Sequence, residues 1–342
     1  MKNTGNKETI FNGIIHYRFV YKRKKELKIM IKEKILITGG AGYIGSILTE
    51  HLLKKGYPVT CLDNLSFGYN SLLHLVSNFN FNFIYGDVRD EKLLKKTIPN
   101  FDVIIPLSAI VGAPQCDSNP VDAKLINRDS VITMNKIRTP EQKIIFPNTN
   151  SGYGTTAGDL HCTEETPLNP ISLYGITKTE AEEHLLNSNK DAITLRLATV
   201  FGMSPRMRTS LLVNDFVFKA LNDGYLVIYE KDFKRNYVHV RDVSRCFEHC
   251  IKNYEAMKNN SYNVGLDSAN LSKEELAEKV KNHIPKLDIT YKEIDKDPDK
   301  RNYIVSSKKL MNSGFECKHD LDYGIEEMIR GYGLILKKNF SK

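Results

Sequence analysis

The sequence lacks several features that would assign it to a class at once. No run of eighteen or more apolar residues appears, so we expect no membrane-spanning helix. The six cysteines form no Cys-x-x-Cys pair and have no ligand-like spacing with histidine. Reduced thiols in a cytoplasmic protein are the favoured interpretation, although Cys246 and Cys250 are close enough for a metal or redox pair. There is also no internal repeat and no low-complexity tract.

The net positive charge is concentrated in the N-terminal segment. Residues 1–29 carry eight Lys and Arg against two Glu, so +6 of the net charge of +8 lies there. Nucleic-acid binding would depend on this segment alone, and we expect no nucleic-acid partner. We expect residues 1–29 to be a poorly ordered extension or the product of an early start codon, with a basic tether as the alternative. The segment does not resemble a secretory signal, because its charges follow its apolar stretch.

From Lys34 onward, short apolar runs alternate with helical patterns. This alternation predicts an α/β fold of the Rossmann type, a doubly wound parallel sheet covered by helices on both faces. The rhythm changes after Gly202, which predicts a dinucleotide-binding domain at 30–202 and a smaller α/β substrate lobe at 203–342, part of which threads back onto the sheet. A capping box, Ser272 to Glu275, predicts a helix start in that lobe. The expected strands are 34–38, 58–63, 81–87, 102–108, 143–148, 192–197 and 262–265, and the expected helices are 43–55, 90–98, 119–136 and 172–187.

The segment TGGAGYIGS, residues 38–46, predicts a phosphate-binding loop. It lies between the first strand and the first helix, and its glycines let the chain turn tightly and let backbone N–H groups approach a pyrophosphate at the helix N-terminus. A glycine pattern alone also occurs in plain turns, but this context favours a dinucleotide. The residues expected at the pyrophosphate are Gly39, Gly42, Tyr43, Ile44 and Gly45.

Acidic residues end the second and third predicted strands. Asp63 follows Gly45 by eighteen residues, where a carboxylate accepts hydrogen bonds from a ribose 2′-hydroxyl and repels a 2′-phosphate. NAD is therefore favoured over NADP, and Asn64 is included in the same site. Asp87 and Val88 end the third strand, where we expect the adenine.

A second motif, SLYGITK at 172–178, places Tyr174 and Lys178 on one face of a predicted helix. A phenol with a pKa of about 10 is a poor base at neutral pH, but a neighbouring ammonium stabilises the phenolate. Thr149, after the fifth strand, can hydrogen-bond the same substrate hydroxyl. Together the three residues predict removal of a proton and a hydride from one carbinol. A surface Tyr with an extended Lys is the alternative for this spacing taken alone.

With these motifs in view, the sequence resembles the extended short-chain dehydrogenase/reductase superfamily of nucleotide-sugar epimerases and dehydratases. The resemblance covers Met30 to about Tyr332 and includes TGGAGYIG, LDNLSFG, GDVRD, EETPLNPISLYGITK and RNYVHVRD. It implies tightly held NAD, a nucleoside-diphosphate sugar as substrate, Tyr174 as base with Lys178 as its partner, and Thr149 in place of the usual Ser. It also implies that Leu107, Ser108 and Ala109 contact the cofactor.

The same resemblance suggests residues for the substrate. Arg235 and Arg301 match family arginines that neutralise the substrate pyrophosphate, and Arg206 and Arg208 are further candidates. Thr199 stands where the common epimerase has an Asn that helps to position the sugar phosphate, so we expect the substrate to be bound differently here. Asn150 and Ser151 are also expected to face the substrate.

Asn150 and Ser151 also bear on the reaction. The resemblance implies that family dehydratases have Asp-Glu directly after the Thr. Asn150 and Ser151 occupy these positions here, and neither can serve as a carboxylic acid or its base, which disfavours 4,6-dehydration. A sugar-nucleotide 4-dehydrogenase and a 4-epimerase both remain, since both use Thr149, Tyr174 and Lys178. Phrases such as PNTNSGYG and LRLATVFGMSPRMR are similar to a bacterial subgroup that includes GDP-manno-heptose 4-dehydrogenases of capsule polysaccharide pathways, which favours the dehydrogenase.

Two further expectations concern catalysis and assembly. A non-catalytic NAD-binding protein is disfavoured, because such proteins often lack the Tyr or the Lys. The family resemblance implies a homodimer formed through helices such as 119–136 and 172–187, although an apolar stripe on those helices could equally belong to the core.

Overall fold

The computed structural model describes residues 32–155, 161–292 and 302–336. The chain divides into two units, Met1–Glu33 and Lys34–Lys342, and the described helices and strands all belong to the second. The expectations for residues 1–29 and for Arg301 lie outside the described residues. Within the described part of the chain, no helix is both long enough and apolar enough to cross a membrane.

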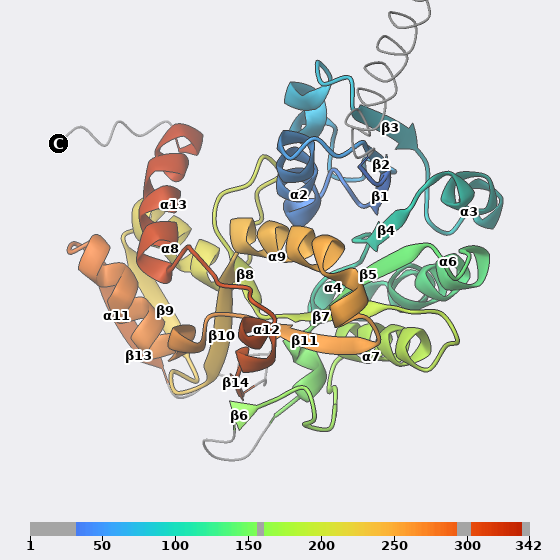
Figure 1. The fold of residues 1–342 in the computed structure, drawn as a ribbon. Helices are drawn as coiled ribbons and strands as arrows, with labels where there is room; N and C mark the ends of the chain where they lie inside the picture. The colour runs from blue at the N-terminus through green and yellow to red at the C-terminus, as the bar shows by residue number, and fades with distance from the viewer. Residues whose placement is uncertain (1–31, 156–160, 293–301, 337–342) are drawn as a thin grey trace, which may run out of the picture. The chain divides into compact units, whose positions relative to one another are not determined.

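A seven-stranded, wholly parallel sheet forms the centre of this unit (Figure 1). Its strand order is β11-β7-β5-β4-β1-β2-β3, so the order reverses between β1 and β4. In open parallel sheets of this kind, ligands bind outside the carboxyl ends of the strands at such a reversal. The strands are β1 (Ile35–Thr38), β2 (Val59–Asp63), β3 (Phe81–Tyr85), β4 (Val103–Pro106), β5 (Lys143–Thr149), β7 (Ile193–Leu197) and β11 (Asn260–Val264).

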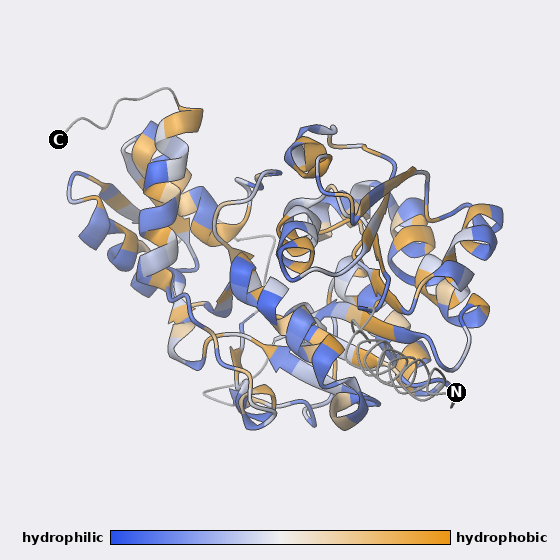
Figure 2. Ribbon diagram, turned by 45° about the horizontal axis from the view of Figure 1, so that its top comes forward, coloured by the Kyte–Doolittle hydropathy of each residue, from blue (hydrophilic) through white to orange (hydrophobic). Residues whose placement is uncertain are grey.

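The continuous apolar runs of the inner strands are explained by burial on both faces, whereas the edge strand β3 is largely exposed. In β1, Ile35 and Ile37 pack in one core cluster with α2 and α9, whereas Leu36 packs in a second cluster with α3, α6 and α7. Because successive side chains of a strand point to opposite faces, both halves of the apolar run are needed. Figure 2 shows apolar colour along the strands and mixed colour around the helices. These helices are α2 (Tyr43–Lys54), α3 (Glu91–Thr97), α6 (Ser130–Ile137), α7 (Leu173–Leu186) and α9 (Val240–Lys252).

The helix expected at 119–136 is not uniform. It consists of α5 (Pro120–Lys124), a π-helical turn (η3, Leu125–Asp129) and α6. The turn contains Asn127, which is fully buried and whose amide is bonded to the backbone of Ile110. Periodicity in a sequence does not reveal such a widened turn, because it adds a single residue to the repeat.

Residues after Gly202 contribute to two regions. A core cluster separate from the sheet forms between α8 (Leu212–Asn222), α11 (Lys273–His283) and α13 (Leu321–Ile335), and the Ser272–Glu275 capping box is present at the start of α11. By contrast, β11 and α9 belong to the central sheet and its covering layer. The small sheets contain β8 (Thr199–Phe201), β10 (Lys234–His239) and β12 (Asn270–Ser272); β9 (Tyr225–Tyr229) and β13 (Asp288–Lys292); and β6 (His161–Cys162) and β14 (Ile304–Val305).

Short helices complete the described elements. They are η1 (Asn70–Leu75), η2 (Ile98–Asn100), α4 (Ala113–Ser118), η4 (Asn150–Tyr153), α10 (Tyr254–Met257), η5 (Asp267–Ala269) and α12 (Lys308–Asn312). All six cysteines are free thiols, and Cys246 and Cys250 are both buried in α9. In the described ranges, no group of His, Cys, Asp and Glu side chains is placed to hold a metal ion.

Candidate active site

The loop between β1 and α2 has the shape that a diphosphate requires. Gly39 has φ +76°, and a Cβ there would lie 2.7 Å from the backbone nitrogen of Ser108, beyond the end of β4. A Cβ at Gly45 would lie 2.2 Å from the Gly39 carbonyl oxygen, so α2 can approach the loop only without a side chain there. Gly42 is the N-cap of α2 and supplies no side-chain cap. The helix N-terminus thus presents backbone N–H groups and its positive end to a ligand, which fits the pyrophosphate of a dinucleotide.

Asp63 ties this loop to the one that follows β2. Its carboxylate accepts hydrogen bonds from the backbone N–H of Ala41 (2.9 Å) and of Leu65 (2.8 Å). A carboxylate has about four acceptor positions, so Asp63 can still accept from ribose hydroxyls. Asp63, which the sequence predicts to bind the ribose, therefore also stabilises the phosphate loop.

Asp87 is more heavily engaged than the sequence suggested. Hydrogen bonds from the Arg89 side chain lower the pKa of Asp87 to about 2, and Asn64 donates a further bond of 3.1 Å. Val88 beside it is buried. In the predicted adenine site, Asp87 therefore already accepts hydrogen bonds from Asn64 and Arg89.

The segment after β4 is positioned by a residue that sequence reasoning missed. Leu107, Ser108 and Ala109 are half-buried at the end of the strand. Directly after them, the Ile110 N–H donates to Asn127 Oδ1 (2.8 Å) and the Ile110 carbonyl accepts from Asn127 Nδ2 (2.9 Å). Asn127 thus fixes both backbone groups of the segment that leaves β4.

Thr149 ends β5 and caps the turn that follows. Its hydroxyl donates to Ser151 Oγ (2.9 Å) and accepts from the Ser151 N–H (3.1 Å). Asn150 and Ser151 are both enclosed, with exposed fractions of 0% and 1%. Neither amide atom of Asn150 has a hydrogen-bond partner among the described residues. The contact of Asn150 and Ser151 with a substrate stays a prediction.

Tyr174 and Lys178 lie in the first two turns of α7, which Ser172 caps by accepting from the Gly175 N–H. Tyr174 is half-buried, whereas Lys178 is only 3% exposed, with its ammonium 3.9 Å from the centre of the Phe146 ring. Burial lowers the pKa of Lys178 to about 7, although the charge of Glu182 opposes this shift. The ammonium is therefore close to its titration point at neutral pH.

Glu182 is a second residue that sequence reasoning missed. It lies one turn beyond Lys178 in α7, is 1% exposed, and accepts from Arg196 Nε (2.9 Å), Arg196 Nη2 (2.7 Å) and Asn148 Nδ2 (2.8 Å). These contacts join α7 to β5 and β7 directly beneath Thr149. The spacing Tyr-x-x-x-Lys-x-x-x-Glu, which places all three on one helix face, was the available signal.

The substrate-side arginines occupy different places. Arg235 lies in β10, is 3% exposed, and donates to the Lys234 carbonyl (3.0 Å). Arg206 and Arg208 lie in the loop between β8 and α8, and both are half-buried. Thr199 is the first residue of β8 and pairs with Tyr237 of β10.

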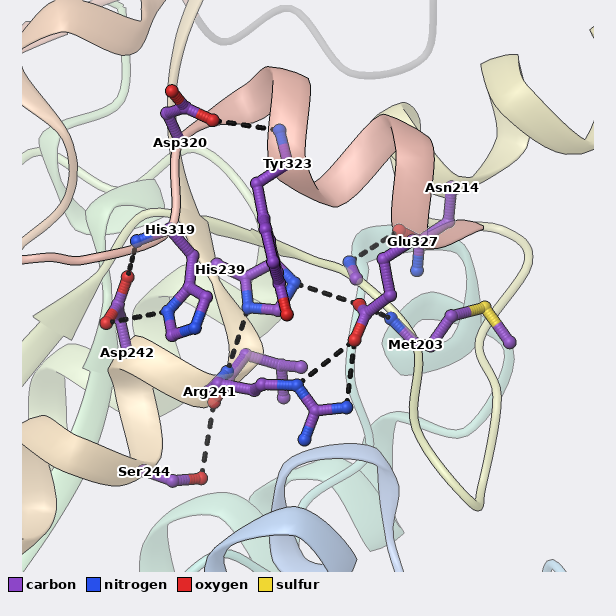
Figure 3. Close-up of polar contacts among 12 residues, drawn as sticks. Met203, Asn214, His239, Arg241, Asp242, Ser244, His319, Asp320, Tyr323 and Glu327 are labelled. Atoms are coloured by element: carbon purple, nitrogen blue, oxygen red, sulfur yellow. Dashed lines mark hydrogen bonds and ion pairs between the residues drawn. The ribbon is translucent and has the colours of Figure 1, made fainter. Parts of the chain in front are cut away.

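A charged cluster anchors the start of that loop (Figure 3). Glu327 of α13 accepts from the Met203 N–H (2.9 Å), from Arg241 (2.8 Å) and from His239 Nε2 (3.0 Å). His239 Nδ1 accepts from the Arg241 N–H, so Nε2 carries the proton when the ring is neutral. Burial lowers the pKa of His239, which favours that neutral form.

An open parallel sheet with a glycine loop at its switch point and a Thr, Tyr and Lys beside it defines a dinucleotide-dependent enzyme of the Rossmann type. The chain belongs to the NAD dependent epimerase/dehydratase family, whose model matches residues 35–265. NAD is thus the cofactor, and the glycine loop and the uncapped N-terminus of α2 fit it.

Known relatives agree in fold over most of the chain. UDP-arabinose 4-epimerase 1 of Arabidopsis thaliana is 28% identical over 306 residues, which are 78% of this chain and 73% of the relative. The structure of a UDP-glucose 4-epimerase from Thermotoga maritima with UDP-glucose has a TM-score of 0.76 at 25% identity and covers 89% of this chain and 99% of its own. A UDP-Glc/GlcNAc 4-epimerase from Campylobacter jejuni has a TM-score of 0.75 at 25% identity, with coverages of 87% and 98%.

Proposed function

We propose that the protein is a nucleotide-sugar 4-epimerase acting on a UDP-sugar. The observation that carries this proposal is the placement of Thr149, Tyr174 and Lys178 at the carboxyl end of β5 and on α7, with Asn150 and Ser151 where a dehydratase needs acids. The epimerase names of the relatives support it. They favour this function over the dehydrogenase that the motif phrases suggested.

In the proposed reaction, the substrate hydroxyl at C4 is held by Thr149 and loses its proton to the phenolate of Tyr174. NAD, when bound, accepts the C4 hydride and later returns it. The ammonium of Lys178 stabilises the phenolate and can hold the ribose next to the nicotinamide. If the 4-keto sugar turns over before the hydride returns, Tyr174 gives its proton back to the C4 oxygen and the product is the epimer.

A dehydratase would need further proton transfers. The C5 proton must leave and the C6 hydroxyl must be protonated, and both steps require a positioned acid or base. Asn150 and Ser151 are uncharged and enclosed, and neither can take this part. We therefore propose that the chemistry is confined to C4.

The 4-dehydrogenase remains the second candidate. It would use the same three residues and release the 4-keto sugar instead of reducing it again. The phrases PNTNSGYG and LRLATVFGMSPRMR, which are similar to the GDP-manno-heptose subgroup, are the observation in its favour.

The test is to incubate purified protein and NAD separately with UDP-glucose, UDP-N-acetylglucosamine, UDP-xylose and a GDP-hexose. We expect a chromatographically distinct isomer of unchanged mass from a UDP-sugar, and no such product from Tyr174→Phe, which should still bind NAD. A released product two mass units lighter, with stoichiometric NADH absorbing near 340 nm, would instead establish the dehydrogenase. An active Tyr174→Phe variant would remove Tyr174 from the mechanism.

We also propose that the substrate diphosphate is bound by Arg235 and Arg301 and that residues 203–342 supply most of the substrate site. A guanidinium presents paired donors that match phosphate oxygens. Arg235 is buried in β10, in the part of the chain that we propose binds the substrate.

We further propose a homodimer through α5, α6 and α7. Val121 and Ile176 are exposed apolar residues of α5 and α7, with exposed fractions of 69% and 38%. A groove lined by Arg128, Ile132 and Glu180 runs between α6 and α7. Light scattering coupled to size-exclusion chromatography should give twice the chain mass, and Ile176→Glu should give the monomer; a monomeric wild-type protein at micromolar concentration would contradict the proposal.

A further inference from the structure

The loop from Gly202 to Arg208 lies directly against the cofactor loop. The Tyr43 hydroxyl donates to the Gly202 carbonyl (2.7 Å), and the Ser204 hydroxyl donates to the Tyr43 carbonyl (2.8 Å). Asn214 of α8 donates to both the Tyr43 hydroxyl (3.2 Å) and the Arg208 carbonyl (2.9 Å). A segment that sequence analysis assigned to the substrate is therefore fastened to the first turn of α2, where the pyrophosphate of NAD would bind.

Arg206, in the same loop, extends this contact to the loop after β2, where we expect the adenosine ribose of the cofactor. Its guanidinium carbon lies 4.1 Å from the centre of the Phe67 ring, which is within the range of a cation–π contact. Phe67 belongs to the loop after β2, four residues beyond Asp63. The two residues are far apart in the chain, so only the fold brings an arginine to the ribose-binding loop.

The guanidinium of Arg206 lacks an anionic partner within the described ranges. Its side-chain hydrogen bond is to the Met207 carbonyl (2.6 Å), and no carboxylate of those ranges forms an ion pair with it. Burial lowers the pKa of Arg206, which means that the protein around it does not compensate its charge. A half-buried cation held in a fixed place without a counter-ion suits an anionic ligand.

We propose that Arg206 binds the diphosphate of NAD from above the cofactor loops, with Phe67 holding its guanidinium in place. This inference rests on the NAD requirement of the proposed function, and it transfers Arg206 from the substrate site to the cofactor site. Arg208 lies two residues further along the same loop and close enough to Tyr174 for their charges to interact, although burial lowers the pKa of Arg208. Arg235, in contrast, lies in β10 beside Tyr303, with 5.6 Å between its guanidinium carbon and the ring centre.

The test compares Arg206→Gln with Arg235→Gln as a matched control. Binding of NADH is followed by its own fluorescence, which tryptophan cannot obscure because the chain has none, and binding of UDP is followed by calorimetry. We expect Arg206→Gln to weaken NADH binding about tenfold, as loss of a charge-assisted contact does, with UDP binding unchanged. Arg235→Gln should show the reverse. If NAD co-purifies, the rate at which added NADH replaces it is the readout and should rise in Arg206→Gln.

Two further variants test whether the effect on NADH binding comes from the charge of Arg206 and from its contact with Phe67. Arg206→Lys should recover part of the NADH affinity, and Phe67→Leu, which removes the stacking surface, should weaken NADH binding less than Arg206→Gln does. Thermal unfolding by circular dichroism must show that all variants are folded. Weakened UDP binding with unchanged NADH binding in Arg206→Gln would return the residue to the substrate site, and no change in either would exclude it from both. Because neither readout requires turnover, an inactive protein that binds NADH in this way would overturn the proposed epimerase but not this assignment.

Discussion

At the scale of single residues, Lys178 has the most unusual environment in the site. It is almost completely enclosed, its ammonium faces the Phe146 ring, and Glu182 one helical turn away is the acidic residue that favours its charged form. Burial of an ammonium opposes its charge, so the site retains a cation there at a cost to stability. An uncharged residue of similar volume would remove that cost together with the ammonium that we propose stabilises the Tyr174 phenolate.

The cost should be visible in the pH dependence of stability. The folded-state pKa of Lys178 is about 7 and its ordinary value is 10.5, so between these pH values the unfolded chain holds the proton and the folded chain does not. We therefore expect Lys178→Met to be more stable than wild type at pH 7 and below. This advantage should shrink as the pH rises toward 10.5, by at most about 1.4 kcal/mol per pH unit.

Urea unfolding of the two proteins at several pH values, without added NAD, measures this difference. Lys55→Met, which removes an exposed lysine after α2, is the control and should leave the pH dependence unchanged. A constant difference between Lys178→Met and wild type from pH 7 to 10 would show that Lys178 is not desolvated as described.

At the scale of secondary-structure elements, α7, which carries Tyr174 and Lys178, is joined to the sheet by a buried ion pair. Glu182 of α7 receives two hydrogen bonds from Arg196 of β7 and one from Asn148 of β5, and the side chains of the ion pair are only 2% and 7% exposed. Arg196 also donates to the Tyr153 hydroxyl (3.0 Å), which extends the network to the turn after Thr149. The relative position of Thr149 and Tyr174 therefore depends on contacts beneath the site.

We expect Glu182→Gln to destabilise the protein by about 3–5 kcal/mol, because Arg196 would remain as an uncompensated buried charge. In the double variant Glu182→Gln/Arg196→Met that charge is absent, and much of the stability should return. Urea unfolding of the single and double variants forms the appropriate comparison. Equal destabilisation of the single and double variants would mean that packing, not charge, explains the loss.

At the scale of the whole compact unit, Glu327 connects three distant parts of the chain. It joins α13 to His239 and Arg241 at the start of α9 and to Met203 at the start of the loop that carries Arg206 and Arg208 (Figure 3). His319 stacks on His239 with 4.9 Å between ring centres and pairs with Asp242, so the cluster continues behind the ring. Although burial raises the pKa of Glu327, hydrogen bonds from His239 and from the Met203 N–H lower it to about 2.

This depressed pKa predicts acid sensitivity that a neutral residue would not have. The ordinary value is 4.5, so the contribution of Glu327 is complete above that pH and is lost as the pH falls toward 2. Wild type should exceed Glu327→Gln in stability by about 1–3 kcal/mol at pH 6, and the gap should close on acidification. Denaturant unfolding at pH 6, 4 and 3 tests this, with Glu326→Gln at an exposed neighbouring position as the control. A gap at pH 3 that is as large as the gap at pH 6 would contradict it.

Local patterns in the sequence determined much of the fold and those parts of the candidate site that are continuous in the chain. Apolar runs predicted the six strands β1 to β5 and β7. For the inner strands the reason is burial on both faces, which requires apolar residues throughout, whereas β3 lies at the edge of the sheet and is largely exposed. The glycine loop is equally local, because strand, turn and helix follow one another directly; the binding of the cofactor by this loop and by Asp63 stays a prediction. The spacing of Tyr174 and Lys178 needed only the geometry of one helix.

Tertiary structure decided what depends on distant segments. The sequence placed no arginine near Asp63, yet the fold brings Arg206 against Phe67 in the loop that follows it. Likewise, Asn127 lies in a π-helical turn that periodicity in the sequence does not reveal. Glu182 of α7 forms its ion pair with Arg196 of β7, which only the fold brings next to it. The physical reason is the same in each case. The role of a charged or amide side chain depends on its interaction partners, and partners that are far apart in the chain come into contact only after the sheet has formed.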